Sequence, residues 1–234
     1  DAEVRRSCCW SLVQLREMML DDAKVQVGQP LQARQKTMYL PDTINMISAM
    51  MAGKIEAFDL VLQPTTVMPT REPVLAMVTD PIWYTSMLLN FLTNACKHAA
   101  QQVHMRMTVV HRAGQLFERQ SSSLRRLKSG AHQADDTHVV PTTAFLRTEV
   151  HDDGKGVSDE LAERLFHEMF VRGQERDEGT GVGLCTVQAQ CTTLGGRCGL
   201  GTSDILGGAV FWFEIPFHPD DTHTSSSNVG GRGS

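Results

Sequence analysis

The chain has 234 residues, of which 41% are apolar and 21% charged, as in ordinary globular proteins with one sizeable domain and a smaller attachment. A net charge of −5 gives no reason to expect a nucleic-acid partner, because such proteins carry a basic excess. No apolar run has membrane-spanning length and no signal peptide is present, so we expect a cytoplasmic location. The start at Asp1 suggests a fragment of a larger parent protein, either with or without a membrane anchor.

The first part of the chain predicts two helical stretches, roughly Glu3–Val27 and Thr43–Glu56. They are separated by breaks at Gly28-Gln29-Pro30 and at Pro41, after which Asp42 offers a helix cap. We interpret residues 1–57 as part of a helical hairpin that serves either as a dimerisation element or as a linker.

Residues 58–217 read as one domain in which strands alternate with helices. Strands are predicted at Asp59–Leu62, Val74–Val78, Val103–Val110, Ala144–Val150, Arg197–Thr202 and Ala209–Ile215. Helices are predicted from Pro81 to about Ala99, over Val157–Phe170, and from Gly183 to Gly195. The fold class is therefore α+β, a two-layer α/β sandwich with helices on one face of a mixed sheet.

Two polar stretches are predicted to lack regular structure. One is an insertion at about 114–143, which is long for a loop in a compact domain. The other is the Ser- and Gly-rich tail at 218–234. The six cysteines form no Cys-x-x-Cys pair, so we interpret them as reduced intracellular thiols, and no His/Cys cluster has the spacing of metal ligands.

The helix predicted from Pro81 carries a polar stripe opposite an apolar face. Met87 interrupts this stripe, whose members are Ser86, Asn90, Asn94, Lys97 and His98. Asn is unfavourable inside helices, so two of them on one face indicate a lined cleft, although a surface helix with incidental Asn is the alternative. An Asn carbonyl suits Mg²⁺ shared with phosphates, and a Lys would neutralise phosphate charge.

Two glycine-containing segments follow. Asp152-Asp153-Gly154-Lys155-Gly156 comes directly after a predicted strand, and a buried carboxylate there can accept a hydrogen bond from an adenine amine; the same letters also spell an ordinary turn. Gly179, Gly181 and Gly183 lead into a helix whose first N–H groups can face phosphates. Their spacing fits neither the dinucleotide fingerprint nor the Walker loop.

In this order and spacing, the three segments resemble the N-box, G1-box and G2-box of the histidine-kinase ATP-binding domain, over roughly Thr79 to Pro216. This domain belongs to the gyrase, heat-shock-chaperone, histidine-kinase and mismatch-repair superfamily, and the resemblance implies the Bergerat-type fold with ATP and Mg²⁺ as ligands. It also implies a dimeric parent protein and a response regulator or receiver domain as partner.

The resemblance assigns roles to individual residues. Asn94, with Asn90, is expected to ligate Mg²⁺, Lys97 and His98 to line the site, and Asp152 to read adenine. The remaining expected ATP-binding residues are Gly154, Gly156, Arg172, Gly179, Thr180, Gly181, Val182, Gly183 and Leu184. Leu165–Phe170 resembles the F-box, and Val171–Glu178 is expected to form a mobile lid over ATP.

Three departures shape the expected function. Asn90 stands where ATP-hydrolysing relatives carry a general-base Glu, and an amide cannot take up that proton. Ala209 replaces a frequent Ser or Thr near adenine. No histidine precedes His98, so the phosphoryl acceptor was either cut off upstream or lost.

We therefore expect transfer of the ATP γ-phosphoryl group to a histidine outside the N-terminal part of this chain, in a two-component or phosphorelay pathway. The alternatives are a catalytically silent nucleotide sensor, an ATPase clamp of the same superfamily, and plain helical scaffolding.

Overall fold

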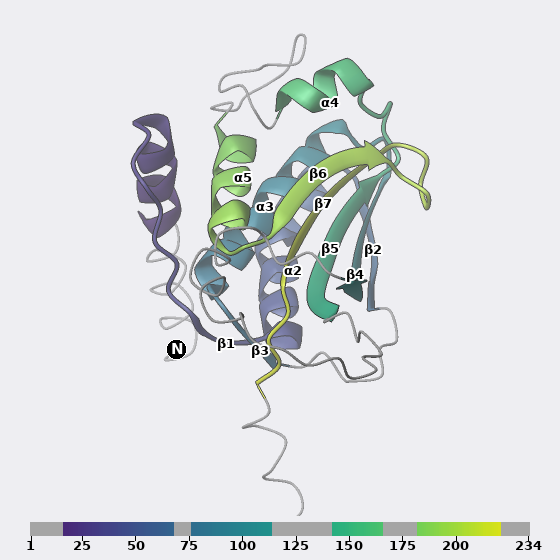
Figure 1. The fold of residues 1–234 in the computed structure, drawn as a ribbon. Helices are drawn as coiled ribbons and strands as arrows, with labels where there is room; N and C mark the ends of the chain where they lie inside the picture. Colours follow the sequence, from purple (N-terminus) through teal and green to yellow (C-terminus); the bar gives the residue numbers. More distant parts are fainter. Residues whose placement is uncertain (1–15, 68–75, 114–141, 166–181, 221–234) are drawn as a thin grey trace, which may run out of the picture.

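The computed structural model describes residues 16–67, 76–113, 142–165 and 182–220 (Figure 1). Within these ranges the strands form a five-stranded sheet in the order β2-β4-β5-β7-β6. Its strands are β2 (Val61–Val67), β4 (Gln102–Ala113), β5 (Thr142–Asp152), β6 (Arg197–Thr202) and β7 (Ala209–Pro216). β2 runs parallel to β4 and the other neighbours are antiparallel, so the sheet is mixed.

The helices form a second layer against one face of this sheet (Figure 1). α3 (Pro81–His98) contacts β4, β5 and β7, and it is flanked by α2 (Leu40–Ala57) and α5 (Gly183–Thr193). A short helix, α4 (Asp159–Leu165), contacts β6. The predicted two-layer α/β sandwich is confirmed.

The long helix α3 begins where its sequence provides a cap. The carboxylate of Asp80 accepts hydrogen bonds from the N–H groups of Ile82 and Trp83 at 3.0 and 3.1 Å, and Pro81 occupies the first turn. These contacts satisfy amides that have no partner within the helix. The capped start fixes where each later residue of α3 points, including those of the predicted polar stripe.

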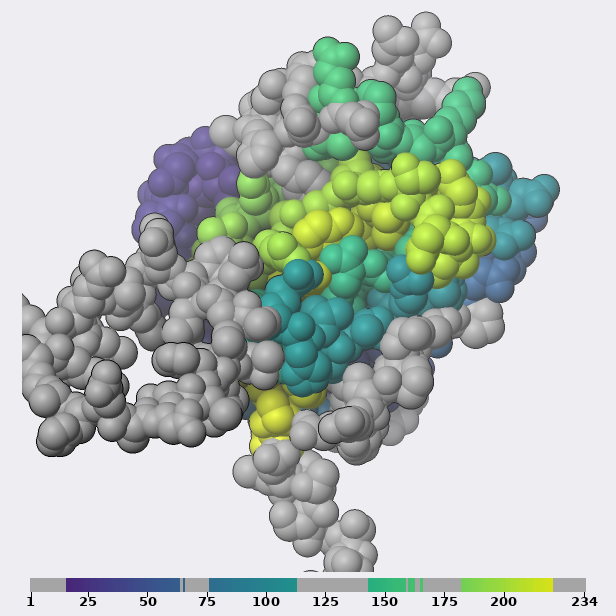
Figure 2. Space-filling view, turned by 45° about the vertical axis from the view of Figure 1, so that its right-hand side comes forward, coloured from purple at the N-terminus to yellow at the C-terminus, as the bar shows by residue number. Residues whose placement is uncertain are grey.

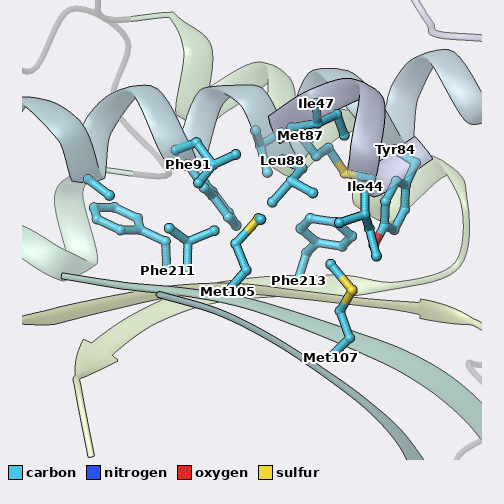
Figure 3. Close-up of a cluster of buried hydrophobic side chains, with 14 of the residues drawn as sticks. Ile44, Ile47, Tyr84, Met87, Leu88, Phe91, Met105, Met107, Phe211 and Phe213 are labelled. Atoms are coloured by element: carbon cyan, nitrogen blue, oxygen red, sulfur yellow. The ribbon is translucent and has the colours of Figure 1, made fainter. Parts of the chain in front are cut away.

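The apolar side of α3 packs on the sheet and forms the centre of the core (Figure 3). Fully buried side chains of the helix, among them Leu88 and Phe91, meet Phe213 from β7 and Met105 from β4. Met87, which interrupts the polar stripe, is also fully buried, because α2 brings Ile47 to that side of α3. The flanking helix α2 thus covers a side chain, Met87, that a helical wheel places on the polar side of α3.

The N-terminal part departs from the expected hairpin. A helical segment at 16–26 is present, but β1 (Lys36–Tyr39) separates it from α2 and pairs with β3 (Ala76–Thr79). α2 itself buries Ile47 and Met51 in the same core as α3. A domain boundary at residue 57 would therefore cut through one hydrophobic core. The division between residues 1–57 and 58–217 stays a prediction.

In both polar stretches, some of the predicted irregular residues pair with neighbouring strands. Thr142 and Thr143 belong to β5, because their pairing with β4 extends to Ala113. The backbones of His218 and Asp220 make hydrogen bonds with β3, at Val78 and Ala76. Residues 114–141 and 221–234, which hold the rest of the predicted insertion and tail, lie outside the described residues.

On the opposite face of the sheet, strands reach the surface of the molecule (Figure 2). Glu214, which is fully buried, accepts hydrogen bonds from Arg112, Arg147 and Arg197, and two of these guanidinium groups lie over the ring of Trp212. This arrangement satisfies the buried carboxylate. Burial opposes ionisation, but the three arginines lower the pKa of Glu214 to about 2.

Candidate nucleotide-binding site

The turn after β5 is fastened to the end of α3. The Asp153 carboxylate accepts hydrogen bonds from the backbone N–H groups of Ala100 and Gln101 at 2.8 and 3.0 Å. The chain then passes through Gly156, whose φ of +72° is a conformation that favours glycine. The last residues of the polar stripe on α3 are thereby held next to the Asp-x-Gly-x-Gly segment, which follows them about 55 residues later in the chain.

Asp152 lies at the end of β5 and is almost completely buried. Its Oδ1 accepts hydrogen bonds from the N–H groups of Gly154 and Ala209, at 2.9 and 3.1 Å. Its Oδ2 is equally buried and has no hydrogen-bond partner among the described residues. Burial raises the pKa of this carboxyl, and the two N–H donors oppose that rise only in part. A buried acceptor without a donor is costly, so the position favours an external donor.

Bare backbone surrounds Asp152. A Cβ on Gly154 would lie 2.2 Å from the carbonyl oxygen of His98, so the turn after β5 and the end of α3 approach as closely as glycine permits. A Cβ on Gly208 would lie 2.5 Å from the carbonyl oxygen of Asp152 and 2.6 Å from its Oδ1. Three segments of the chain therefore converge on the carboxylate without side chains between them, as a flat ligand requires.

At the other end of the site, α3 meets the first turn of α5. A Cβ on Gly183 would lie 2.4 Å from Oδ1 of Asn90, so the amide oxygen directly faces this backbone. The Asn90 Nδ2 donates to the Ser86 carbonyl one turn earlier at 3.0 Å, which turns Oδ1 away from the helix. The contact brings the N-box helix and the end of the glycine-rich segment together, and it leaves an oxygen ligand of the kind that Mg²⁺ prefers.

The remaining expected residues are placed less tightly. Asn94 and Lys97 are half-buried on the same stripe of α3 as Asn90, and the His98 side chain is exposed. Val182 is fully buried at the start of α5, while Leu184 packs against the core. The other predicted residues lie outside the described ranges; they are Arg172, Gly179, Thr180 and Gly181, with most of the F-box and the expected lid.

Three contributors to this site were missed by sequence reasoning. Gly208 admits the close approach to Asp152, and the backbone N–H of Ala209 donates to it, whereas sequence reasoning considered only the side chain of Ala209. Asp153 ties the turn to the end of α3. For Gly208, the sequence did hold a signal, because a pair of glycines directly before β7 often marks close backbone packing.

These features together define an ATP-binding domain: a buried carboxylate among glycine backbone at one end, and amide oxygens facing a helix start at the other. Among the described residues, no group of three or more His, Cys, Asp or Glu could hold a metal ion. The chain belongs to the family of histidine kinase-, DNA gyrase B- and HSP90-like ATPases, whose pattern it matches over residues 79–219.

Its relatives are proteins of two-component signalling. It is 43% identical over 74 residues to the sensor histidine kinase AruS of Pseudomonas aeruginosa, covering 30% of this chain and 7% of that protein. It is 28% identical over 162 residues to two-component system protein A of Emericella nidulans, covering 68% of this chain and 19% of that protein. The chain thus spans less than a fifth of the length of these curated relatives.

Among solved structures, the chain resembles full-length ShkA in complex with AMPPNP, with a TM-score of 0.59 and 23% identity. The match covers 90% of this chain and 36% of ShkA, and it supports the fold. Across the parts of the chain that the structure describes, every helix falls short of the length and apolar character needed to cross a membrane.

Proposed function

We propose that this chain binds Mg²⁺–ATP and transfers the γ-phosphoryl group to a histidine supplied by a longer form of the chain or by a partner chain. The observation that carries the proposal is the buried, unpartnered Oδ2 of Asp152 in its setting of glycine backbone. An adenine amine is a flat-ring donor that suits this acceptor, whereas the carbonyl of guanine offers a second acceptor in its place.

The magnesium ion would be held by the amide oxygens of Asn94 and Asn90, together with the phosphates. When bound, the ion would neutralise negative charge on the phosphates. In support, Asn90 already directs Oδ1 toward the start of α5, and Asn94 lies one helical turn further on the same stripe. Lys97, another turn along, adds a positive charge, and His98 places its backbone against Gly154.

Transfer to a histidine, as opposed to hydrolysis, is supported by the amide at position 90. An amide cannot remove a proton from an attacking water, so it leaves the γ-phosphoryl group for a better nucleophile. Catalysis would consist mainly of positioning and charge neutralisation. The proposal implies a cytoplasmic setting, where ATP is present, a response regulator or receiver domain as recipient, and a homodimeric parent protein.

The decisive experiment is incubation of the parent protein, or of this chain with the acceptor-bearing part of the parent, with γ-labelled ATP. We expect label on protein that is lost in acid and kept in alkali, as a phosphohistidine is. Saturable ATP binding without labelling would instead support the nucleotide-sensing alternative. Steady-state hydrolysis would support the ATPase clamp.

Asn94→Ala tests the magnesium assignment directly. The variant should lose Mg²⁺-dependent nucleotide binding, because the ion loses its principal side-chain oxygen. The measurement is calorimetric titration with a non-hydrolysable ATP analogue, with and without Mg²⁺. Thr193→Val, an exposed change on α5, is the control. An Asn94→Ala variant with unchanged affinity would remove Asn94 from the site.

A further inference from the structure

The helical segment at 16–26 lies beside α5 (Figure 1) and turns two consecutive carboxylates toward the domain. Asp21 is 5% exposed and accepts a hydrogen bond from the indole Nε1 of Trp83 at 2.7 Å. Asp22 accepts one from the hydroxyl of Thr186 at 2.5 Å. The two neighbours therefore reach two different helices, because Trp83 belongs to α3 and Thr186 to α5.

These contacts are specific, because burying carboxylates is unfavourable unless their oxygens are paired. Burial raises the pKa of Asp22, and the hydroxyl of Thr186 offsets only part of that rise. Asp21 is additionally paired with Lys24 at 3.2 Å. A segment without specific contacts to the domain would keep both acidic side chains in water.

A second attachment holds the other end of this segment. The backbone N–H of Arg34 donates to Oδ2 of Asp80 at 2.7 Å, and Asp80 is the residue that caps α3. The Arg34 side chain also pairs with Glu17 at 3.4 Å. Residues 16–34 are thereby fastened around the start of α3 at both ends, and we call them the upstream strap.

On α5, the strap reaches the turn that forms part of the site. The N–H of Thr186 donates to the carbonyl of Val182 at 3.0 Å, within the first turn of α5. In the same turn, Gly183 lies against the Asn90 side chain. The hydroxyl of Thr186 is therefore one helical turn from the backbone that faces the N-box amide, and a rigid helix transmits its position over that length.

We propose that Asp22 is a positioning residue: through Thr186 it holds the first turn of α5 against Asn90, so that the upstream strap sets the affinity of the site for nucleotide. This inference rests on the proposed function and names the means of its regulation. A movement of the segment at 16–26 that separates Asp22 from Thr186 lowers nucleotide affinity without touching the nucleotide.

The test measures binding of a non-hydrolysable ATP analogue with Mg²⁺ to the 234-residue chain, together with amide hydrogen exchange in α5 without nucleotide. Thr186→Val removes the donor and keeps the shape, and Asp22→Ala removes the acceptor. Asp22→Asn keeps an acceptor oxygen and serves as the conservative rescue. Thr193→Val is the matched control on the same helix, because its exposed hydroxyl bonds only to the carbonyl of Ala189 in the described structure.

Thr186→Val and Asp22→Ala should each weaken binding about tenfold, the low end of what the loss of one hydrogen bond to a charged group costs. Their double variant should bind as each single variant does, because both remove the same contact. Asp22→Asn should stay within about twofold of the unchanged chain, given that it keeps the acceptor. Exchange of amides in the first turn of α5 should speed up in the two disrupting variants only.

Unchanged affinity and unchanged exchange in Thr186→Val and Asp22→Ala would overturn the inference. So would an Asp22→Asn variant as weak as Asp22→Ala, because charge and not position would then matter. Thermal melting identifies any variant that fails to fold. Since exchange is measured without nucleotide, it tests the hold of Asp22 on α5 even if the unchanged chain binds no ATP, in which case the proposed function alone fails.

Discussion

At the proposed adenine end of the site, Asp152 is held by backbone N–H groups of the turn after β5 and of β7, and the end of α3 packs against that turn. At the proposed phosphate end a side chain, Asn90, meets the first turn of α5. Backbone against backbone cannot adjust without moving whole strands, but the end of an amide side chain can rotate. The comparison teaches that the two ends tolerate change differently: the proposed base contact is built into the fold, while the proposed phosphate contacts depend on how α5 is held.

The largest expected effect is at the adenine end. Gly154→Ala would place a methyl group 2.2 Å from the His98 carbonyl oxygen, and both partners are backbone. We expect a loss of about 3 kcal/mol in the free energy of unfolding, from overpacking that cannot relax. Urea denaturation measures it. Gly53→Ala in α2, where a Cβ meets nothing within 4 Å, should gain up to about 1 kcal/mol. A Gly154→Ala variant of unchanged stability would break the comparison.

Asp152→Asn should reverse the preference for the base. The amide oxygen can still accept from Gly154 and Ala209, so its nitrogen takes the position of Oδ2 and offers a donor where ATP needs an acceptor. We expect ATP affinity to fall about 10- to 100-fold and the affinity for inosine triphosphate to rise. Competition binding with the two nucleotides gives the ratio. An unaltered ratio would mean that Asp152 does not read the base.

Gly183→Ala probes the phosphate end in the matching way. The added methyl group would lie 2.4 Å from Oδ1 of Asn90, but this is the end of a side chain that can turn aside. The fold should therefore lose only about 1 kcal/mol, while nucleotide binding weakens more than stability does, because Asn90 leaves its place. Denaturation and calorimetric binding on one preparation separate the two effects. Equal losses for Gly183→Ala and Gly154→Ala would erase the distinction between the ends.

The smallest effect is on pH dependence. Because burial raises the pKa of Asp152 above its unfolded value, lowering the pH from neutral toward that pKa protonates it first in the folded chain. The chain without nucleotide should gain stability in this window, while ATP affinity falls, because a protonated carboxyl no longer offers both oxygens as acceptors. The three arginines lower the pKa of Glu214 to about 2, so this carboxylate stays ionised over the whole window. In binding and melting measured from pH 7 to 5, Asp152→Asn should lose the fall in affinity and show a smaller gain in stability, because Asp22, whose pKa burial also raises, still contributes.

Sequence periodicity predicted α3 almost to the residue, since Pro81 and the apolar face both mark it, and it predicted β7 from its apolar run. The order of motifs indicated the family, and the family is confirmed. β1 was missed because four residues, Lys36–Tyr39, carry too little alternation to stand out. The two helices read as a hairpin because sequence cannot show that α2 buries Ile47 beside α3.

For the site, residue types indicated which groups belong together but not how they are held. The hold of Asp153 on Ala100 spans 53 residues, and that of Asp22 on Thr186 spans 164. Neither contact produces a pattern in the sequence, because each one joins two elements that come together only in the folded protein. The predicted roles of Asn94, Lys97, Arg172 and the glycines at 179–181 stay predictions.

The place of β7 within the sheet has a consequence for synthesis. β7 is the last strand of the described residues, yet it lies between β5 and β6, and the N–H of Ala209 at its start donates the second hydrogen bond to Asp152. A nascent chain that has emerged only as far as β6 has an open gap in its sheet and half of its carboxylate contacts. Any premature stop before residue 209 therefore leaves a product that lacks part of the proposed base site and that exposes unpaired strand edges to aggregation.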